Sequence, residues 1–308
     1  MRPRLRNRVT AASLALVAAF LWSTYYLFVL GVGSGARPSA VLFVPFASGG
    51  VAYGLWAFAR GEGHLLGRMF LDARAYVRVA FLLVMQFSVL AATYLTGPVD
   101  ASLLSLLGDV VATPIVVAVL FAEGRRELGS PPFIAGLLLC LAGGTLAIAG
   151  GHGLETVHDL GWTVVLTVPA GVAFYFVLSA RAGRDGTPLT VIVAQSFIAA
   201  AVLTAVLAPL LPGGSAGLVA LGPLPLLLLV VNGLLSFFVA PVLYFRSIEH
   251  AGFIFPPLIM TGIPVFTLLL SAAVLAIAPA SLALLGVPVA AVGGIVALVA
   301  GGREPAPP

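Results

Sequence analysis

Residues 102–121 read SLLSLLGDVVATPIVVAVLF, and their one ionisable side chain is Asp109. About 20 apolar residues is the length that an α-helix needs to cross roughly 30 Å of hydrocarbon. Comparable apolar runs recur along the whole chain, so this stretch predicts one membrane-spanning helix among several. The runs are continuous rather than alternating, which argues against a transmembrane β-barrel.

The composition supports the same fold class. Of the 308 residues, 61% are apolar and 8% are charged, and the mean hydropathy is +1.15. A soluble domain of this length needs more charge to cover its surface, and an open sheet would leave unpaired edges in lipid. The chain is therefore predicted to be an all-α polytopic membrane protein.

Ten transmembrane helices are expected, joined by short connections that carry Gly and Pro. Their approximate bounds are 9–30, 39–59, 75–95, 102–121, 132–150, 161–180, 188–208, 225–245, 253–274 and 281–300. The first run resembles a signal peptide because arginines precede it, but it is too long for a signal core. We interpret it as a retained first span.

The chain also matches itself at a shift of 150 residues. The matched pairs include Tyr25/Tyr175, Pro38/Pro188, Phe87/Phe237, Tyr94/Tyr244, Pro114/Pro264, Gly136/Gly286 and Gly143-Gly144/Gly293-Gly294. We interpret this as a duplication, with a first five-helix repeat at 1–150 and a second at 151–308. An odd number of spans per repeat inserts the second repeat upside down, and inverted repeats are typical of secondary transporters.

The basic residues predict the orientation. All 15 are arginines, and the ten spans place 14 of them on one side, with Arg37 alone on the other. Positive charge accumulates in cytoplasmic loops, so both termini are expected in the cytoplasm. Arginine-only, Ala- and Gly-rich usage favours a bacterial inner membrane. The arginines form no basic face, so nucleic acid is not an expected partner, and none is expected inside the membrane.

Several blocks of sequence carry a family pattern. The first span ends in LWSTY at 21–25, the fourth reads ASLLSLL at 101–107 before Thr113-Pro114 and FAEGRR at 121–126, and the fifth and tenth carry matched glycine strings. In these blocks the chain resembles the drug/metabolite transporter superfamily, in particular its EamA-type ten-helix members. The second copy departs from the pattern, reading AVLAI at 273–277. The resemblance implies alternating-access transport of amino acids, nucleotide precursors, choline-like molecules or drugs, without catalysis.

Asp109 is the main candidate for the binding site. It lies about nine residues, or roughly 13 Å, from the outer end of its span, near the midplane. A carboxylate there costs several kcal/mol unless it is paired, hydrated or protonated. It shares a helical stripe with Ser102, Ser105 and Thr113, which is expected to face a cavity. Asp109 is expected to bind a substrate ammonium or carry a coupled proton. The alternative is a structural role, capping backbone near Pro114 or bonding a neighbouring helix.

Other polar and aromatic residues complete the predicted substrate site. The amides are Gln86, Gln195 and Asn232, and the aromatic residues are Trp22, Tyr25, Tyr26 and Tyr175. The amides either orient a polar substrate group or join two helices. The aromatic rings either hold an aromatic or quaternary ammonium substrate or pack as in any bundle. Tyr94 and Tyr244, near span ends, are expected to be packing and interfacial residues.

Prolines and glycines recur at matched positions. Pro114 and Pro264 each remove a backbone N–H from helices four and nine, so we expect kinks there, at the cavity or gate or as simple bends. The glycine pairs at 143–144 and 293–294 are expected to allow close helix contact, within the fold or in a homodimer face.

The expected function is secondary active transport by alternating access. The leading hypothesis is proton-coupled export of small amphipathic metabolites such as amino acids or amines, and the alternative is uptake of choline or another quaternary ammonium. The alternatives of a different class are a lipid flippase and a membrane-embedded enzyme. A flippase would need several intramembrane basic residues, and an enzyme would need a reactive cluster at one leaflet. No cofactor or metal is expected, because GxxxxGK[ST] and HExxH motifs are absent and Cys140 is the sole cysteine.

Overall fold

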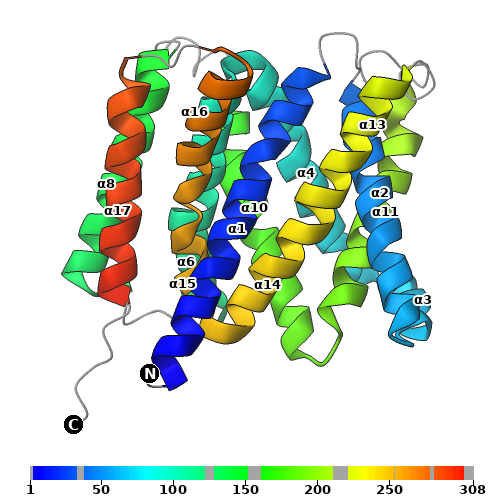
Figure 1. Cartoon of the computed structure of the whole chain (residues 1–308). Helices are drawn as coiled ribbons and strands as arrows, with labels where there is room; N and C mark the ends of the chain where they lie inside the picture. Colours follow the sequence, from blue (N-terminus) through cyan, green and yellow to red (C-terminus); the bar gives the residue numbers. More distant parts are fainter. Residues whose placement is uncertain are drawn as a thin grey trace.

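The structure, a computed structural model, describes residues 3–32, 38–121, 128–151, 161–210, 221–252, 254–277 and 281–301. Within these residues the secondary structure is helical, and ten helical segments are long and apolar enough to cross a membrane (Figure 1). The chain is therefore a multi-pass membrane protein of the all-helical class.

Each predicted span has a counterpart, although spans four, seven, eight and nine are each built from consecutive shorter segments. The segments are α1 (Pro3–Gly31), α2 (Pro38–Ala59), α3 (Gly63–Leu71), α4 (Ala73–Thr96), α5 (Pro98–Leu106), η1 (Leu107–Ala112), α6 (Thr113–Phe121), α8 (Pro131–Gly151), α10 (Gly161–Arg184), α11 (Leu189–Leu207), η2 (Ala208–Leu210), α13 (Pro223–Asn232), η3 (Gly233–Val239), α14 (Ala240–Ala251), α15 (Phe255–Ile259), α16 (Gly262–Val274) and α17 (Ala283–Gly301).

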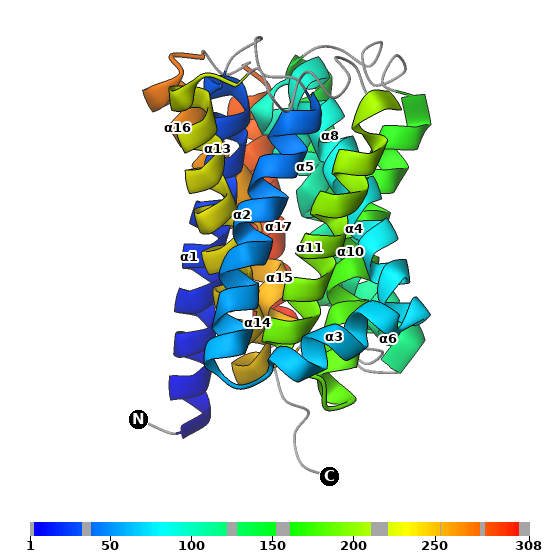
Figure 2. The same cartoon turned by 90° about the vertical axis from the view of Figure 1, so that its right-hand side faces the viewer.

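The short helix α3 is an element that the span pattern does not predict. It is too short to cross the bilayer, and it lies at the end of the bundle where α1 begins (Figure 2). Leu66 and Met69 are buried on one face, whereas Arg68 is exposed on the other. This amphipathic pattern is typical of a helix at the membrane–water interface.

Two spans are interrupted at matching positions. Span four changes to the π-helix η1 at Leu107–Ala112, and span nine breaks between Ile259 and Gly262, which lie within the same positions shifted by 150 residues. Pro114 and Pro264 follow each interruption, in the first turn of the next helical segment. Because proline lacks an N–H and its ring clashes with the preceding turn, an α-helix cannot run through these positions unchanged.

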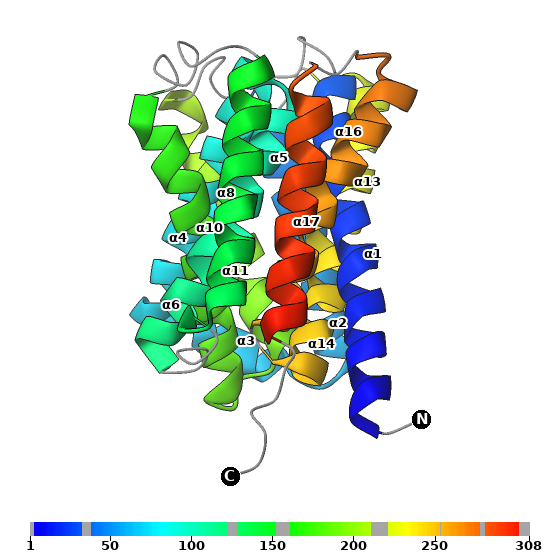
Figure 3. The ribbon, with the colours of Figure 1, turned by 90° about the vertical axis from the view of Figure 1, so that its left-hand side faces the viewer.

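The helices α8 and α17 pack against each other, antiparallel, at one edge of the bundle (Figures 1 and 3). A Cβ atom added to Gly136 would lie 2.7 Å from the carbonyl oxygen of Gly293, and one added to Gly143 would lie 2.6 Å from that of Gly286. The two backbones therefore touch, which only glycine allows at these four positions. We call this contact the glycine seam.

The adjacent glycines behave differently from those in the seam. A Cβ atom on Gly294 would lie 2.0 Å from Thr261 Cγ2, so this glycine faces α15 and the break in span nine instead. A Cβ atom on Gly144 would meet nothing closer than Leu107 Cδ2 at 3.8 Å, an ordinary contact distance. The close contact expected of both glycine pairs therefore holds for Gly143, Gly293 and Gly294, but not for Gly144.

The end of the bundle at which α1 begins also holds the end of α17 (Figure 1). Because consecutive spans alternate in direction, α2, α10 and α14 also end there, and α4 begins there. The arginines on or beside these elements are Arg8, Arg60, Arg68, Arg74, Arg78, Arg181, Arg184 and Arg246. Outside the described residues lie Arg2, Arg37, Arg125, Arg126, Arg303 and the expected outer loops around Glu155, Asp159 and Pro212.

Candidate functional site

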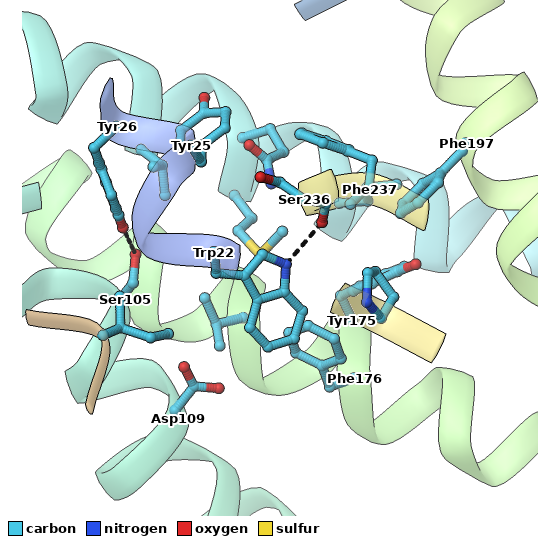
Figure 4. A pocket seen from close by; sticks show the side chains of 17 residues that line it. Trp22, Tyr25, Tyr26, Ser105, Asp109, Tyr175, Phe176, Phe197, Ser236 and Phe237 are labelled. Atoms are coloured by element: carbon cyan, nitrogen blue, oxygen red, sulfur yellow. Dashed lines mark hydrogen bonds between the residues drawn. The ribbon is translucent and has the colours of Figure 1, made fainter. Parts of the chain in front are cut away.

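A cavity lies in the interior of the bundle, between α1, α4, span four, α10, span eight and α16 (Figure 4). The cavity has a volume of about 80 Å³. Seven of the nine predicted substrate-binding residues line it, namely Trp22, Tyr25, Tyr26, Gln86, Ser105, Asp109 and Tyr175. The remaining lining residues are Leu82, Met85, Val89, Val172, Phe176, Phe197, Ser236, Phe237, Pro241 and Ile263.

The carboxyl group of Asp109 is held in this cavity by the π-helix η1 (Figure 4). Its side chain is 3% exposed, and Oδ1 has no hydrogen-bond partner among the described residues. The hydroxyl groups of Tyr26 and Tyr244 are near enough to interact with it electrostatically. Neither backbone near Pro114 nor a neighbouring helix satisfies this oxygen within the described part of the chain. A buried acid in this state suits a ligand cation or a proton.

A short hydrogen-bonded chain joins α1 to span four beside Asp109. Ser105 Oγ donates a hydrogen bond to the carbonyl oxygen of Ala101 at 3.2 Å. The Tyr26 hydroxyl lies 3.1 Å from Ser105 Oγ and is the donor in that bond, because the serine proton is already committed. Tyr26 and Ser105 are thus fixed relative to each other, while Asp109 Oδ1 stays free of both.

Only the two middle residues of the predicted polar stripe reach the cavity. Ser105 and Asp109 line the cavity, whereas Ser102 and Thr113 are buried and donate to carbonyl groups of their own helix, Ser102 Oγ to Val99 at 2.6 Å and Thr113 Oγ1 to Gly108 at 2.9 Å. In η1 the backbone hydrogen bonds join residues i and i+5, which changes the helical register of the residues that follow. Thr113 therefore leaves the face on which α-helical spacing places it.

The indole of Trp22 has a structural partner as well as a cavity-facing ring. Its Nε1 donates to the carbonyl oxygen of Ser236 at 2.9 Å, and Ser236 Oγ donates back to the carbonyl of Leu21 at 3.1 Å (Figure 4). In η3 the N–H of Ala240 bonds to Leu235, five residues earlier. By the same count the carbonyl of Ser236 would need the N–H of Pro241, which has none. Trp22 supplies the missing donor.

Aromatic rings form the walls of the cavity. Trp22 and Phe176 line it and pack on each other and on the buried Tyr244 outside the lining, with ring centroids 5.6, 5.2 and 4.8 Å apart. Tyr25 packs on Phe237 from another side, at 5.9 Å. These distances are typical of stabilising aromatic pairs, and ring faces of this kind attract aromatic and cationic ligands.

Some residues that line the cavity were not predicted, and of the two tyrosines expected to be packing and interfacial residues one is buried and one is exposed. Tyr244 is fully buried beside Trp22 and Asp109, not at an interface, whereas its repeat partner Tyr94 is 40% exposed. The π-helix η3 precedes Tyr244 and has no counterpart in α4, so the register of the two spans differs in space.

Four predicted site residues do not line the cavity. Gln195 on α11 and Asn232 at the end of α13 are fully buried, and their amide oxygen and nitrogen atoms have no hydrogen-bond partner among the described residues. Pro114 and Pro264 lie beyond the interruptions in spans four and nine, away from the residues that line the cavity. Both prolines are buried within the bundle.

The expectation that no arginine lies inside a span is wrong. Arg78 is in α4, five residues after Ala73, and its side chain is 6% exposed. The side chain is covered by the bundle and lies near Tyr175 of α10. Within the described residues, no three His, Cys, Asp or Glu side chains gather as metal ligands would.

No family model matches the sequence, and no curated protein matches it. A solved structure described only as "Crystal structure of protein" has the same fold, with a TM-score of 0.70 and 23% sequence identity. The match covers 96% of this chain and 100% of the other. The ten-helix arrangement is thus one that another chain of the same extent also adopts.

Proposed function

We propose that the protein is a secondary active transporter that moves small amphipathic metabolites, such as amino acids or amines, by alternating access. The observation that carries this proposal is the buried Asp109 carboxyl group, which faces an aromatic cavity in the interior of a membrane bundle. A substrate ammonium or a coupled proton supplies the positive charge that the described residues do not supply. Export driven by the proton gradient uses Asp109 in both roles in turn.

Two inverted five-helix repeats, at 1–150 and 151–308, are part of the proposal. The glycine seam supports it, because Gly136 meets Gly293 and Gly143 meets Gly286. Gly286 is the repeat partner of Gly136, and Gly293 is that of Gly143, so the contact is reciprocal, as a two-fold axis requires. Helices interrupted in matching places of both halves are a feature of such transporters. The resemblance to EamA-type drug/metabolite transporters points to the same arrangement.

We further propose that the protein lies in a bacterial inner membrane with both termini in the cytoplasm. The support is the set of arginines at the end of the bundle where α1 begins and α17 ends, since positive loops stay in the cytoplasm. The partners in this proposal are a small-molecule substrate and the lipid bilayer. No catalytic step is part of it.

Uptake of choline or another quaternary ammonium is the second candidate. The rings of Trp22, Phe176 and Tyr244 beside Asp109 favour it, because aromatic faces and a carboxylate together bind a quaternary ammonium. A lipid flippase is less well supported, because the cavity lining carries an acid and amide but no basic side chain.

The experiment that tests the proposal is flux in proteoliposomes. Labelled aromatic amino acids, threonine and choline are offered with and without a pH gradient, to wild type, Asp109→Asn and Asp185→Asn. Asp185 is an exposed acid after α10 and serves as the matched control. We expect flux of one solute class in wild type and the control, and background flux in Asp109→Asn, because the neutral amide neither attracts a cation nor exchanges a proton.

Asp109→Asn should remain folded, since an amide is nearly isosteric and Oδ1 makes no hydrogen bond within the described chain. Its elution profile and melting temperature in detergent check this. Normal flux through the folded variant at every pH would show that Asp109 is not the site.

A further inference from the structure

A buried guanidinium group lies between the cavity and the end of the bundle at which α4 begins. Arg78 Nε and Nη2 are buried and have no hydrogen-bond partner among the residues that the structure describes. Arginine keeps its charge in proteins, so its burial is costly unless a negative group accompanies it. The proposed transport mechanism, with Asp109 at its centre, leaves this group unexplained.

Two hydroxyl groups on α10 lie in the same place. Tyr175 is close enough to Arg78 to interact electrostatically, and Ser179 neighbours Tyr175 one helical turn further along. The Tyr175 hydroxyl and Ser179 Oγ are buried, and neither has a hydrogen-bond partner in the described chain. Since α4 and α10 pack against each other, unpartnered polar groups of both helices lie at this contact.

Within the described residues, Arg78 makes no salt bridge with an acidic side chain. Asp72 is the acid that acts on it electrostatically, and Asp72 Oδ1 already accepts the backbone N–H of Arg74 at 2.9 Å, as the cap of α4. Two guanidinium nitrogens of Arg78 and the two hydroxyl groups are thus buried without a hydrogen-bond partner among the described residues. That is the chemistry of a site for an oxyanion.

The arginine site adjoins the cavity. Tyr175 lines the cavity, and so does Leu82, one turn after Arg78 on α4. Counted along the helices from the same end of the bundle, Arg78 lies about 7 Å deep and Asp109 about 18 Å deep at 1.5 Å per residue. The two charges are therefore about 10 Å apart in depth. A small solute meets them in succession rather than together.

We propose that Arg78, Tyr175 and Ser179 bind the carboxylate of the transported molecule, which makes the substrate a zwitterionic amino acid. This inference rests on the proposed transport function and specifies its substrate class. A planar guanidinium presents parallel N–H groups to a carboxylate, and the two hydroxyl groups complete the shell. Asp109 attracts the ammonium group deeper in the membrane. Choline lacks a carboxylate and gains nothing from this site.

The test uses pairs of solutes that differ only in the carboxylate, phenylalanine with phenylalaninamide and threonine with threoninamide. Binding to the purified protein is measured by the rise in melting temperature with solute concentration, and exchange is measured in proteoliposomes. The variants are Arg78→Gln and, as control, Arg74→Gln, which changes an exposed arginine one turn earlier on α4. We expect wild type and control to bind the preferred acid about tenfold or more tightly than its amide.

Arg78→Gln is expected to lose this preference while it still binds the amide. Ser179→Ala removes one hydroxyl donor with little change of shape and should weaken the preference in part, which keeps the test open if Arg78→Gln does not fold. Equal binding of acid and amide by wild type would overturn the inference, as would an unchanged preference in the folded Arg78→Gln variant.

The two proposals fail in different ways. If wild type exchanges choline but neither amino acid, the transport function stands and the carboxylate site is wrong. If no solute of the panel exchanges, the transport function itself fails, and the carboxylate site falls with it.

Discussion

Trp22 shows how one residue joins the fold to the cavity. Its indole nitrogen serves the Ser236 carbonyl, which Pro241 leaves without a donor, and its ring packs on Phe176 and Tyr244. The polar edge is thereby used for structure, and the ring remains for a ligand. Trp22 at the cavity could be predicted from its depth in the first span, but its hydrogen bond could not, because the partner lies 214 residues away.

Trp22→Phe should destabilise the protein while leaving an aromatic ring in place. Loss of the Nε1 donor leaves a buried carbonyl unsatisfied, which costs about 1–3 kcal/mol. The measurement is the melting temperature in detergent. Trp56→Phe is the matched control, because the indole nitrogen of Trp56 makes no hydrogen bond within the described residues, and it should shift the melting temperature less. Equal shifts for the two variants would count against the structural role of the Trp22 bond.

Asp109 could be identified from the sequence because an acid in a long apolar run is costly wherever that run crosses a membrane. Arg78 could not, since it lies near a predicted span boundary, where a long side chain usually extends to water. The structure turns it inward to α10 instead. The positions of Gln195 and Asn232 outside the cavity lining could not be predicted either. The sequence around an amide in a span does not differ between a residue that faces a cavity and one that faces a neighbouring helix.

Among the elements, the two π-helices share a rule that single residues do not reveal. Each ends two residues before a proline, ahead of Thr113-Pro114 and Ala240-Pro241. The proline lies five residues after a cavity residue, Asp109 or Ser236, whose carbonyl group would otherwise receive its N–H. Pro114 predicted the interruption of span four, but the type of helix and the resulting change of register needed the structure.

The glycine seam makes a sharp distinction between neighbouring residues of α8. Gly143→Ala would place Cβ 2.3 Å from the backbone nitrogen of Ala290, so α8 and α17 would have to separate. Such overpacking typically costs about 1–3 kcal/mol or more. Gly144→Ala meets Leu107 at an ordinary 3.8 Å and should change stability by about 0.5 kcal/mol at most. Melting temperatures of the two purified variants check this, and similar values would contradict the close approach at Gly143.

For the whole molecule, the number of spans and their order were predictable because apolar length is a strong signal in lipid. The bundle's packing was not, since lipid-facing and buried positions of these spans carry similar apolar residues. The short helix α3 could not be predicted from apolar length, because its nine residues are too few and too polar to be recognised as a span.

Orientation is a property of the whole molecule and can be measured with one cysteine. Gly67→Cys places a thiol on the exposed face of α3, where an added Cβ meets no atom within 4 Å. An impermeant maleimide should label it in inside-out vesicles and not in intact cells. Wild type is the background control, because Cys140 is buried and its Sγ donates to the carbonyl of Ala290. Labelling of Gly67→Cys in intact cells would reverse the proposed topology.

The glycine seam has a consequence for the covalent chain itself. It is formed by backbone atoms of Gly136 and Gly143 on one side and of Gly286 and Gly293 on the other. None of these contacts involves the connection between residues 151 and 161. Two separate polypeptides, each carrying five helices, would present the same surfaces to each other. Under the proposed duplication, the seam corresponds to a subunit interface retained inside a single chain.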